Sequence, residues 1–532
     1  MHEGSRIHFK LRTWPGWLVC FAAAFALYAA TASRGAQWQD SGYFILRAVT
    51  GEAVNPLGLA LSHPLHYWLS RFAVGLDLTE PAFAVTLISS LAAALAVANL
   101  FGCVVALTGN RLAALLVAAS LALANTFWQL ATIAETYTLT AALLTAECWC
   151  LITFIKSTID NQQSTISVTD TARSSRYSNT QFWPFLGMFF FNGLSLANHN
   201  LALLTVPVLV MAALWGVNRG GIPGRFVAFG LMAWVLGSSP YTILVAKEAL
   251  RSADWLGTLH SALFGRIYSE EVLSATISRD RMLINAGFVL LNFPSLFLPA
   301  AIYGLKTAWR TQDFAWLYRL LFLGLITHVL FAIRYPVADQ HYFFIPTYIF
   351  LSLFAGVGYS HWISRPACAE ELTLQNSSTS FHQSRVVLAV ALIVATPIVY
   401  VFVPALARRF DVLGFVERNK PYRDDYVYLF QPWSVSERSA DRLSREAVEL
   451  AGPDGVIIVE DRMAEFAVRY RVKRTARTGI AVVSELPPKE FQEAAAAGRP
   501  VVLVPRDADQ PITHPLTGTW QRKGDLYVLD PQ

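Results

Sequence analysis

Four separate stretches of the chain combine carboxylates, imidazoles and aromatic rings, the side chains that most often do chemistry. A carboxylate can take the proton of an attacking hydroxyl as a general base. Arginine and histidine can neutralise a phosphate and stabilise the negative charge that develops when it leaves. The stretches are Trp38 to Phe44 with Ser62 to Tyr67, Trp128 with Glu135 to Tyr137, Asn198 to Asn200, and Arg334 to Tyr342. The candidate site residues within them are Asp40, His63, Glu135, His199, Arg334, Asp339 and His341.

Each candidate also has a structural interpretation that involves no chemistry. The structural alternatives are an exposed loop acid at Asp40, a turn at His63-Pro64, a helix start at Glu135, backbone hydrogen bonding by His199, and an Arg334–Asp339 ion pair. The functional interpretation gains weight because the four stretches fall on one side of the membrane in the topology derived below. The sequence contains no nucleophilic triad, no P-loop and no metal-ligand spacing. We therefore assign no metal-ligating residues and expect no cofactor, and the sequence does not decide whether the activity needs a metal.

The composition indicates that lipid is the main solvent of this chain. Of its 532 residues, 54% are hydrophobic and 15% are charged, whereas a soluble domain has about 25% charged residues. Apolar runs approach the ~20 residues that cross a bilayer, which predicts about eleven membrane-spanning helices. They lie near 16–32, 82–107, 112–128, 136–155, 182–197, 200–217, 225–246, 284–304, 317–333, 342–360 and 386–405.

The short basic connections predict the orientation of these helices. If the N-terminus, with Arg6, Lys10 and Arg12, is cytoplasmic, then alternation places every basic loop in the cytoplasm, as the positive-inside rule requires. These loops carry Arg111, Lys156, Arg173, Arg176, Arg219, Arg225, Lys306, Arg310, Arg319 and Arg365. We expect a multi-pass protein of the inner (cytoplasmic) membrane. The first apolar run also resembles a signal peptide, with small residues at Ala30-Thr31-Ala32, but the many later spans favour an uncleaved helix.

The character of the chain changes after the last apolar run, which predicts two domains. Residues 1–405 form the membrane domain, and residues 406–532 form a small soluble α/β domain outside the cytoplasm. In the second, short apolar runs at 456–459, 481–483, 501–504 and 526–529 alternate with helical patterns such as 464–470. The outer stretch 247–283 predicts interfacial helices. The polar stretches 157–181 and 370–384 predict flexible linkers. Cys20, Cys103, Cys148, Cys150 and Cys368 predict packing residues rather than disulfides.

The order of several short motifs resembles a bacterial family of multi-spanning proteins related to the transmembrane and protein O-mannosyltransferases. The motifs are Asp40-Ser-Gly-Tyr43, His63-Pro64, Glu135-Thr-Tyr137, Gly193 to His199 and Asp339 to Pro346, followed by Arg423-Asp424-Asp425, Tyr428 to Pro432 and Val456 to Asp461. The resemblance covers most of the chain from about residue 35 to 475. It rests on the order and spacing of the motifs, since each alone is weak.

This resemblance implies a C-type glycosyltransferase fold, a polyprenyl-phosphate sugar as donor, and a catalytic aspartate in the first outer loop. By position, Asp40 matches that aspartate, while Glu135, His199 and Asp339 match polar positions of the family. Two departures affect donor or acceptor choice. Tyr43 stands where the family often has an acid, and Leu65-His66 follows His63-Pro64 where the family often has Pro-Gly.

We expect a membrane glycosyltransferase that moves a sugar, with mannose as one candidate, to an acceptor hydroxyl on the extracytoplasmic side. Asp40 would be the base, His63, Arg334 and His341 would contact the donor phosphate, and Glu135 and His199 would shape the pocket. The expected partners are a polyprenyl-phosphate sugar, a protein or glycan acceptor and membrane lipids, with no nucleic acid. Two alternatives remain: a lipid or solute transporter, which would need ionisable groups along the membrane depth such as Glu147, and a non-catalytic scaffold or sensor built around the soluble domain.

Overall fold

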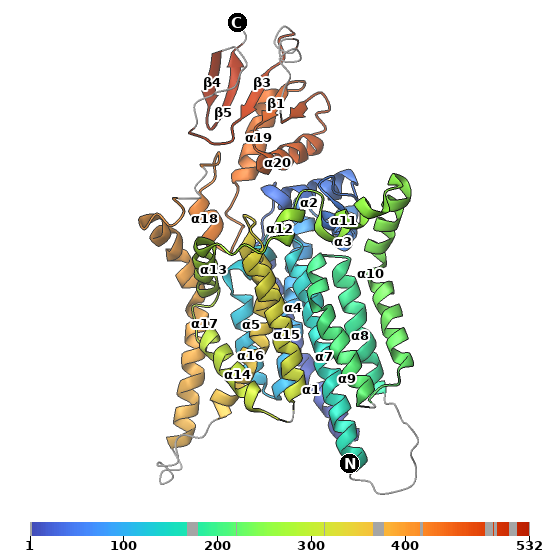
Figure 1. The fold of residues 1–532 in the computed structure, drawn as a ribbon. Helices are drawn as coiled ribbons and strands as arrows, with labels where there is room; N and C mark the ends of the chain where they lie inside the picture. Colours follow the sequence, from blue (N-terminus) through green and yellow to red (C-terminus); the bar gives the residue numbers. More distant parts are fainter. Residues whose placement is uncertain are drawn as a thin grey trace.

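The chain folds into a tall bundle of helices with a small sheet-containing domain on one end (Figure 1). The structure is a computed structural model, and it describes residues 3–166, 179–219, 221–312, 314–364, 377–414, 419–484, 493, 497–509 and 519–530. We call the end of the bundle that carries the small domain the upper end, and the end that carries the N-terminus the lower end.

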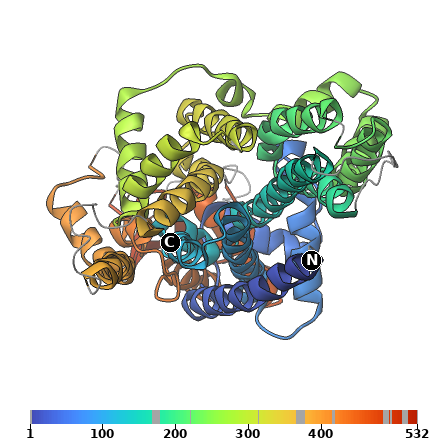
Figure 2. The same ribbon diagram turned by 90° about the horizontal axis from the view of Figure 1, so that it is seen from below.

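Most of the long bundle helices run along a similar direction and are seen nearly end-on in Figure 2. In chain order they are α1 (Glu3–Thr31), α4 (Pro81–Thr108), α5 (Arg111–Ala122), α6 (Asn125–Ala131), α7 (Tyr137–Ile166), α8 (Asn179–Leu196), η2 (Asn200–Thr205), α9 (Val206–Asn218), α10 (Arg225–Ser252), α13 (Arg279–Asn292), α14 (Phe297–Arg310), α15 (Ala315–Arg334), η3 (Gln340–Phe344), α16 (Ile345–Ser364) and α17 (Ser377–Arg409). The segments in α4, α7 and α16 are the most deeply buried, whereas α1, α10 and α17 present many exposed apolar side chains, as lipid-facing helices do.

Eight helices among the described residues are long and apolar enough to cross a membrane, or up to ten if each of two bent helix pairs is one span. All eleven predicted runs lie in helical segments. The run 182–197 is in α8, which packs along α7 and α10 but is not among these eight to ten spans, because Asn179, Thr180, Gln181 and Asn192 lower its hydropathy. The expectation of a polytopic helical membrane protein with a small C-terminal α/β domain is confirmed, with a lower count of spans.

Two predicted spans are bent rather than straight. The pair α5 and α6 is bent by 68°, and the pair α13 and α14 by 99°. The second bend coincides with Pro294, which has no backbone N–H and cannot continue a helix. At the first, the Asn125 amide donates to Phe430 O at 2.8 Å, and Thr126 N donates to Asn292 Oδ1 at 2.8 Å. These polar groups are satisfied across the bundle, where hydropathy alone predicts one continuous span.

Close helix contact in the bundle depends on glycine. A Cβ added at Gly304 of α14 would lie 1.8 Å from Phe354 O, and one at Gly358 of α16 would lie 1.9 Å from Ala300 O. The backbones of α14 and α16 therefore approach each other without intervening side chains. This is the usual way in which small residues drive helix association in lipid.

The basic connections lie at the lower end, as their alternation predicts. Lys156 in α7 donates to Ala106 O of α4 at 2.7 Å, and Gln162 donates to Arg219 O at 2.6 Å.

Two linker predictions need correction: α7 continues to Ile166 and α17 already begins at Ser377, because polar helical turns extend both spans beyond their apolar runs. The side chains of Arg6, Lys10 and Arg12, and residues 167–178 and 365–376 with Arg173, Arg176, Arg365 and Cys368, lie outside the described part. Cys20, Cys103 and Cys148 are buried packing residues, as predicted.

Short helices cover the upper end of the bundle (Figure 1). The first outer loop contains α2 (Gln39–Thr50), η1 (Leu59–Leu61) and α3 (Pro64–Gly75), and the predicted interfacial stretch contains α11 (Trp255–Phe264) and α12 (Ser269–Leu273). Arg47 of α2 fixes the first loop from inside. Its guanidinium donates to Ala53 O at 2.5 Å and Ser62 O at 2.9 Å.

The C-terminal domain begins with α19 (Ser439–Ala451) and contains a five-stranded mixed sheet in the order β2-β1-β3-β5-β4. Its elements are β1 (Val456–Val459), α20 (Arg462–Arg474), β2 (Ala481–Val483), β3 (Val501–Val504), β4 (Thr519–Lys523) and β5 (Leu526–Asp530). Strands β2, β1 and β3 are parallel, and β5 and β4 are antiparallel. The connecting segment, residues 419–438, contains α18 (Asp425–Phe430) and joins this domain to α17. The predicted α/β pattern is confirmed, and α17 extends to Arg409, beyond the predicted boundary at residue 405.

The C-terminal domain and the first outer loop share one hydrophobic core. Helix α2 packs on α20, and buried residues of the first loop such as Trp38 and Ile45 belong to the same cluster as Leu443, Val468 and Val502. The Trp38 indole donates to Ser439 Oγ at 2.8 Å. The small domain is thus anchored directly on the helix that begins with the predicted catalytic acid.

Candidate active site

Asp40 lies in the first turn of α2, at the upper end of the bundle, and is exposed to solvent. The residue before it, Gln39, has a positive φ of 54°, in the left-handed region that non-glycine residues avoid. His63 has the same feature, with a φ of 43°. Such backbone strain costs on the order of 1–3 kcal/mol and persists only where the surrounding structure holds it, commonly at functional sites.

Two further carboxyl groups lie close enough to Asp40 to interact with it electrostatically. Glu135 is buried in the turn before α7, and its Oε1 accepts a hydrogen bond from Ser41 Oγ at 3.0 Å. Asp339 is half-buried in the loop between α15 and η3. Because Glu135 bonds Ser41 of α2, it ties the first outer loop to the start of α7.

The three acids differ in how they carry charge. Burial raises the pKa of Glu135 well above its usual range, and the charges of Asp40 and Asp339 raise it further. Burial, followed by the charge of Asp40, raises the pKa of Asp339 to about 7. Desolvation also raises the pKa of Asp40, although its side chain reaches solvent, and the charge of Asp40 in turn raises the pKa of both other acids. Since like charges in one site disfavour full ionisation, the negative charge is best accommodated on Asp40.

Tyr137 connects the acids to the predicted histidines. Its ring centroid lies 5.3 Å from that of His199 and 5.7 Å from that of Tyr342. The His199 ring lies 5.1 Å from the His63 ring, and His63 Nδ1 is 2.5 Å from Asn198 O. Residues from all four sequence stretches therefore meet around Tyr137, as the topology derived from the basic loops predicts.

The histidines of this cluster are neutral at physiological pH. Burial lowers the pKa of His63 to about 4, and it lowers the pKa of His199 well below its usual range. Burial and the charge of His63 also lower the pKa of His66 to about 3. His66 is one of the two residues that follow His63-Pro64 in place of the Pro-Gly that the resemblance implies. These rings can hydrogen-bond to a sugar or an acceptor, but they do not provide positive charge for a phosphate.

The expected contacts of Arg334 and His341 with a donor phosphate stay predictions, and the structure shows which neighbours each side chain has. The Arg334 guanidinium donates to Val272 O at 3.0 Å and to Ser274 O at 2.9 Å, which fixes the loop after α12. The structure therefore uses Arg334 for loop anchoring, and its guanidinium does not reach across to pair with Asp339. The His341 ring is stacked on Phe288 of α13 with centroids 4.2 Å apart.

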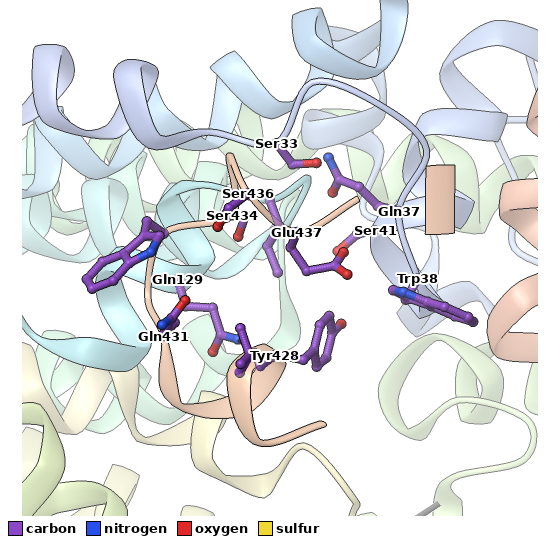
Figure 3. Close-up of a pocket in the computed structure, with 13 residues that line it drawn as sticks. Ser33, Gln37, Trp38, Ser41, Gln129, Tyr428, Gln431, Ser434, Ser436 and Glu437 are labelled. Carbon is purple, nitrogen blue, oxygen red and sulfur yellow. The ribbon is translucent and has the colours of Figure 1, made fainter. Parts of the chain in front are cut away.

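A small pocket opens beside α2, between the first outer loop and the connecting segment (Figure 3). Serine, glutamine and aromatic side chains line it, with Glu437 as the acid. Its lining includes Ser41 and Trp38, the neighbours of Asp40, and Tyr428 of the connecting segment. Amide and hydroxyl groups beside aromatic rings are suited to hydrogen bonding with sugars and to packing on their faces.

The connecting segment contributes Arg423 and Tyr428 to the site, and the sequence analysis did not select either of them as a site residue. The Arg423 guanidinium lies over the Tyr428 ring at 4.3 Å and over the Trp38 ring at 5.1 Å. Burial raises the pKa of Tyr428, and the charge of Glu135 contributes to this shift. The motifs that contain Arg423 and Tyr428 were visible in the sequence, but nothing there placed them near Asp40.

Two other expectations concern charged groups. Within the described part of the chain, no three His, Cys, Asp or Glu side chains are arranged to hold a metal ion. The expectation that the site has no metal ligands stays a prediction. Glu147, the acid within α7, is buried and accepts a hydrogen bond from Asn192 Nδ2 at 3.3 Å. It is held between α7 and α8.

The chain is similar to a known protein family in part of its sequence and to solved structures in its fold. Residues 40–219, about a third of the chain, match the model of the protein O-mannosyl-transferase TMEM260 N-terminal domain. No protein of curated function matches the chain. The structure of ArnT from Cupriavidus metallidurans bound to undecaprenyl phosphate is similar to this one, with a TM-score of 0.57 and 16% identity over 97% of this chain and 98% of that chain. The apo ArnT structure gives a TM-score of 0.55 and 15% identity over the same shares.

The similarity to ArnT extends over nearly the whole of both chains, so it includes the bundle, the first outer loop and the C-terminal domain. At this level of identity it establishes the fold. From Asp40 to Arg219 the chain is thus similar to the N-terminal domain of the TMEM260 protein O-mannosyl-transferases, and as a whole it has the same fold as ArnT.

Proposed function

We propose that this chain transfers a sugar from a polyprenyl-phosphate donor to an acceptor hydroxyl, with Asp40 as the general base. The observation that carries the proposal is the arrangement of the three acids. Asp40 is exposed and suited to be ionised, while burial favours the protonated forms of Glu135 and Asp339. Environments that separate the pKa values of neighbouring carboxyl groups are the usual basis of acid and base assignments.

In the proposed reaction, the acceptor oxygen attacks the anomeric carbon of the sugar and its proton passes to the Asp40 carboxylate. The bond between the anomeric carbon and the phosphate oxygen breaks, and the polyprenyl phosphate leaves with the electron pair. Attack from the face opposite the leaving group inverts the anomeric configuration. The neutral carboxyl groups of Glu135 and Asp339 can donate hydrogen bonds to sugar hydroxyls.

The donor and the side of the membrane are inferred from separate observations. The ArnT structure that shares this fold holds undecaprenyl phosphate, which favours a polyprenyl-phosphate donor. The matched family model describes a protein O-mannosyl-transferase, which favours mannose and a protein acceptor. The basic connections lie at the lower end, and the positive-inside rule favours a cytoplasmic location for such loops. This supports a site outside the cytoplasm at the upper end and a cytoplasmic N-terminus.

The test is transfer of labelled sugar from polyprenyl-phosphate mannose or glucose in membranes that contain the full chain. We expect Asp40→Asn to lower transfer by about 10²- to 10⁴-fold, the usual contribution of a general base. Asp77→Asn is the matched control, because Asp77 is an exposed acid of the same outer loop. Equal transfer by the wild type and Asp40→Asn would remove Asp40 from the mechanism. Absence of transfer from every donor by both proteins would favour a scaffold or transporter.

A further inference from the structure

The Arg423 side chain is held in one place by three neighbours. Its guanidinium lies over the Trp38 and Tyr428 rings, and its Nε donates to Asp425 Oδ1 at 2.5 Å. Only 8% of the side chain is exposed. An arginine fixed by aromatic faces and one carboxylate is pre-organised, so little conformational freedom is lost when it binds another group.

One end of this guanidinium is nevertheless unsatisfied. Arg423 Nη1 is buried and has no hydrogen-bond partner among the described residues. Other arginines at the upper end donate to backbone carbonyl groups: Arg47 to Ser62 O, Arg281 to Val337 O and Arg334 to Val272 O. A buried charged donor without an acceptor is costly, and an absent ligand is one of the few explanations for it.

The position of Arg423 places this free donor beside the proposed site. Trp38, which it covers, is two residues before Asp40 in the loop that begins α2. Tyr428, its other aromatic neighbour, experiences the charges of both Arg423 and Glu135. The guanidinium is therefore located between the connecting segment and the acid cluster.

The other cationic groups near the acid cluster are poorly suited to hold an anionic substrate. Arg47, whose charge acts on His63, already donates to three backbone carbonyl groups. Burial makes His63 and His199 neutral, and the Arg334 guanidinium is bonded to two carbonyl groups. A phosphate that leaves with a negative charge needs a cation or an array of donors. Guanidinium is well suited to this, because its fork of N–H groups matches phosphate oxygens.

We propose that Arg423 binds the phosphate of the lipid-linked donor, so that the connecting segment completes the donor site from the C-terminal side of the chain. This inference rests on the proposed function. It extends that function by assigning the anion contact to Arg423 instead of His63, Arg334 or His341. The same chemistry could serve inorganic phosphate, and the experiment below separates the two sources.

The experiment measures binding of undecaprenyl phosphate, undecaprenol and inorganic phosphate to the purified full chain in detergent micelles. We expect Arg423→Gln to weaken undecaprenyl phosphate binding by about ten- to a hundredfold, the effect of losing a charge-assisted hydrogen bond, with undecaprenol binding unchanged. Arg423→Lys keeps the charge without the fork and should lie between. Arg477→Gln is the matched control, because Arg477 also donates to carbonyl groups, Val448 O and Gly452 O, but within the C-terminal domain.

Three outcomes would overturn the inference. One is equal binding of undecaprenyl phosphate by the wild type and Arg423→Gln. Another is an equal loss of undecaprenol binding, which would mean that the substitution damages the fold. The third is inorganic phosphate binding as tightly as the lipid. The binding assay is independent of sugar transfer. If Arg423→Gln weakens undecaprenyl phosphate binding as expected but the wild type transfers sugar from no donor, the anion site stands and the proposed function fails.

Discussion

The ring of Tyr43 on α2 lies 4.8 Å from the ring of Phe466 on α20. The Arg47 guanidinium also lies over the Tyr43 ring, with its Cζ 5.3 Å from the ring centroid. The resemblance in sequence leads us to expect an acid at position 43, and the tyrosine found there forms a contact between the first outer loop and the C-terminal domain. The departure from the family pattern thus corresponds to a packing role one turn away from Asp40.

This contact predicts that the C-terminal domain positions the catalytic helix. We expect Phe466→Ala to lower transfer about tenfold through kcat, because α2 loses its support and small misplacements of reacting groups are costly. Leu529→Ala is the matched control, since Leu529 packs on the opposite face of the sheet. Both variants should lose stability, by about 2–5 kcal/mol. Equal transfer losses in the two would mean that only the stability of the domain matters. Steady-state kinetics with thermal unfolding measure both.

The pKa of Asp339, raised from 3.8 to about 7, predicts a pH-dependent donor affinity. Below about pH 7 the side chain is neutral in the folded chain, and above it a negative charge appears near the donor phosphate. We expect the KM for the donor to rise between about pH 6 and about pH 8, and Asp339→Asn to remove this rise. The stability that the neutral form contributes is complete below pH 3.8 and is lost as the pH rises to about 7. An unchanged pH profile in Asp339→Asn would contradict the assignment.

The ion pair between Lys420 and Asp461 is buried and joins the connecting segment to the start of α20. We expect Asp461→Asn to destabilise the C-terminal domain by about 3 kcal/mol, because Lys420 would keep a buried charge without a partner. Asparagine can still accept the capping hydrogen bond from Met463 N. In contrast, Glu465→Gln on the same helix should cost less than about 1 kcal/mol, because its partner Arg469 is exposed. Hydrogen exchange of α20 amides would compare the two.

The hydrogen bonds of Arg334 predict a role in loop order. We expect Arg334→Gln to expose the segment around Val272 to faster proteolysis, since two carbonyl groups lose their donor. Undecaprenyl phosphate affinity should stay within about twofold of the wild type, because screened or distant charges contribute little to binding. A loss of affinity as large as that expected for Arg423→Gln would return Arg334 to the donor site.

The bundle was predictable from sequence because a bilayer requires long apolar runs, and such runs are local. The bend after Ala122 was not, because it depends on hydrogen bonds between distant segments, such as Thr126 N to Asn292 Oδ1. The bend after Asn292 has a local signal in Pro294, which hydropathy alone does not detect. The strands β1, β2, β3 and β5 were found from their apolar runs. Strand β4, with the polar sequence Thr-Trp-Gln-Arg-Lys, carries no such signal.

The grouping of Asp40, Glu135, His199 and Asp339 followed from topology alone, since alternation of spans assigns each loop to a side. Their differing charge states did not, because burial of Glu135 and exposure of Asp40 are properties of packing. Arg423 and Tyr428 were missed as site residues for the same reason. They follow the last span, and only tertiary contacts with Trp38 and Gln129 bring them to the site.

The hydrogen bond from Trp38 to Ser439 joins residues 401 positions apart, and this separation has a consequence for biosynthesis. At about 5–20 residues per second, α2 is made roughly 20–80 seconds before the surface of α19 and α20 that covers it. During that time the apolar side of the first outer loop has no partner from its own chain. The packing around α2, the helix that carries Asp40, is therefore completed only after α19 and α20 are made. We expect a nascent chain that stalls before α20 to be inserted in the membrane but inactive.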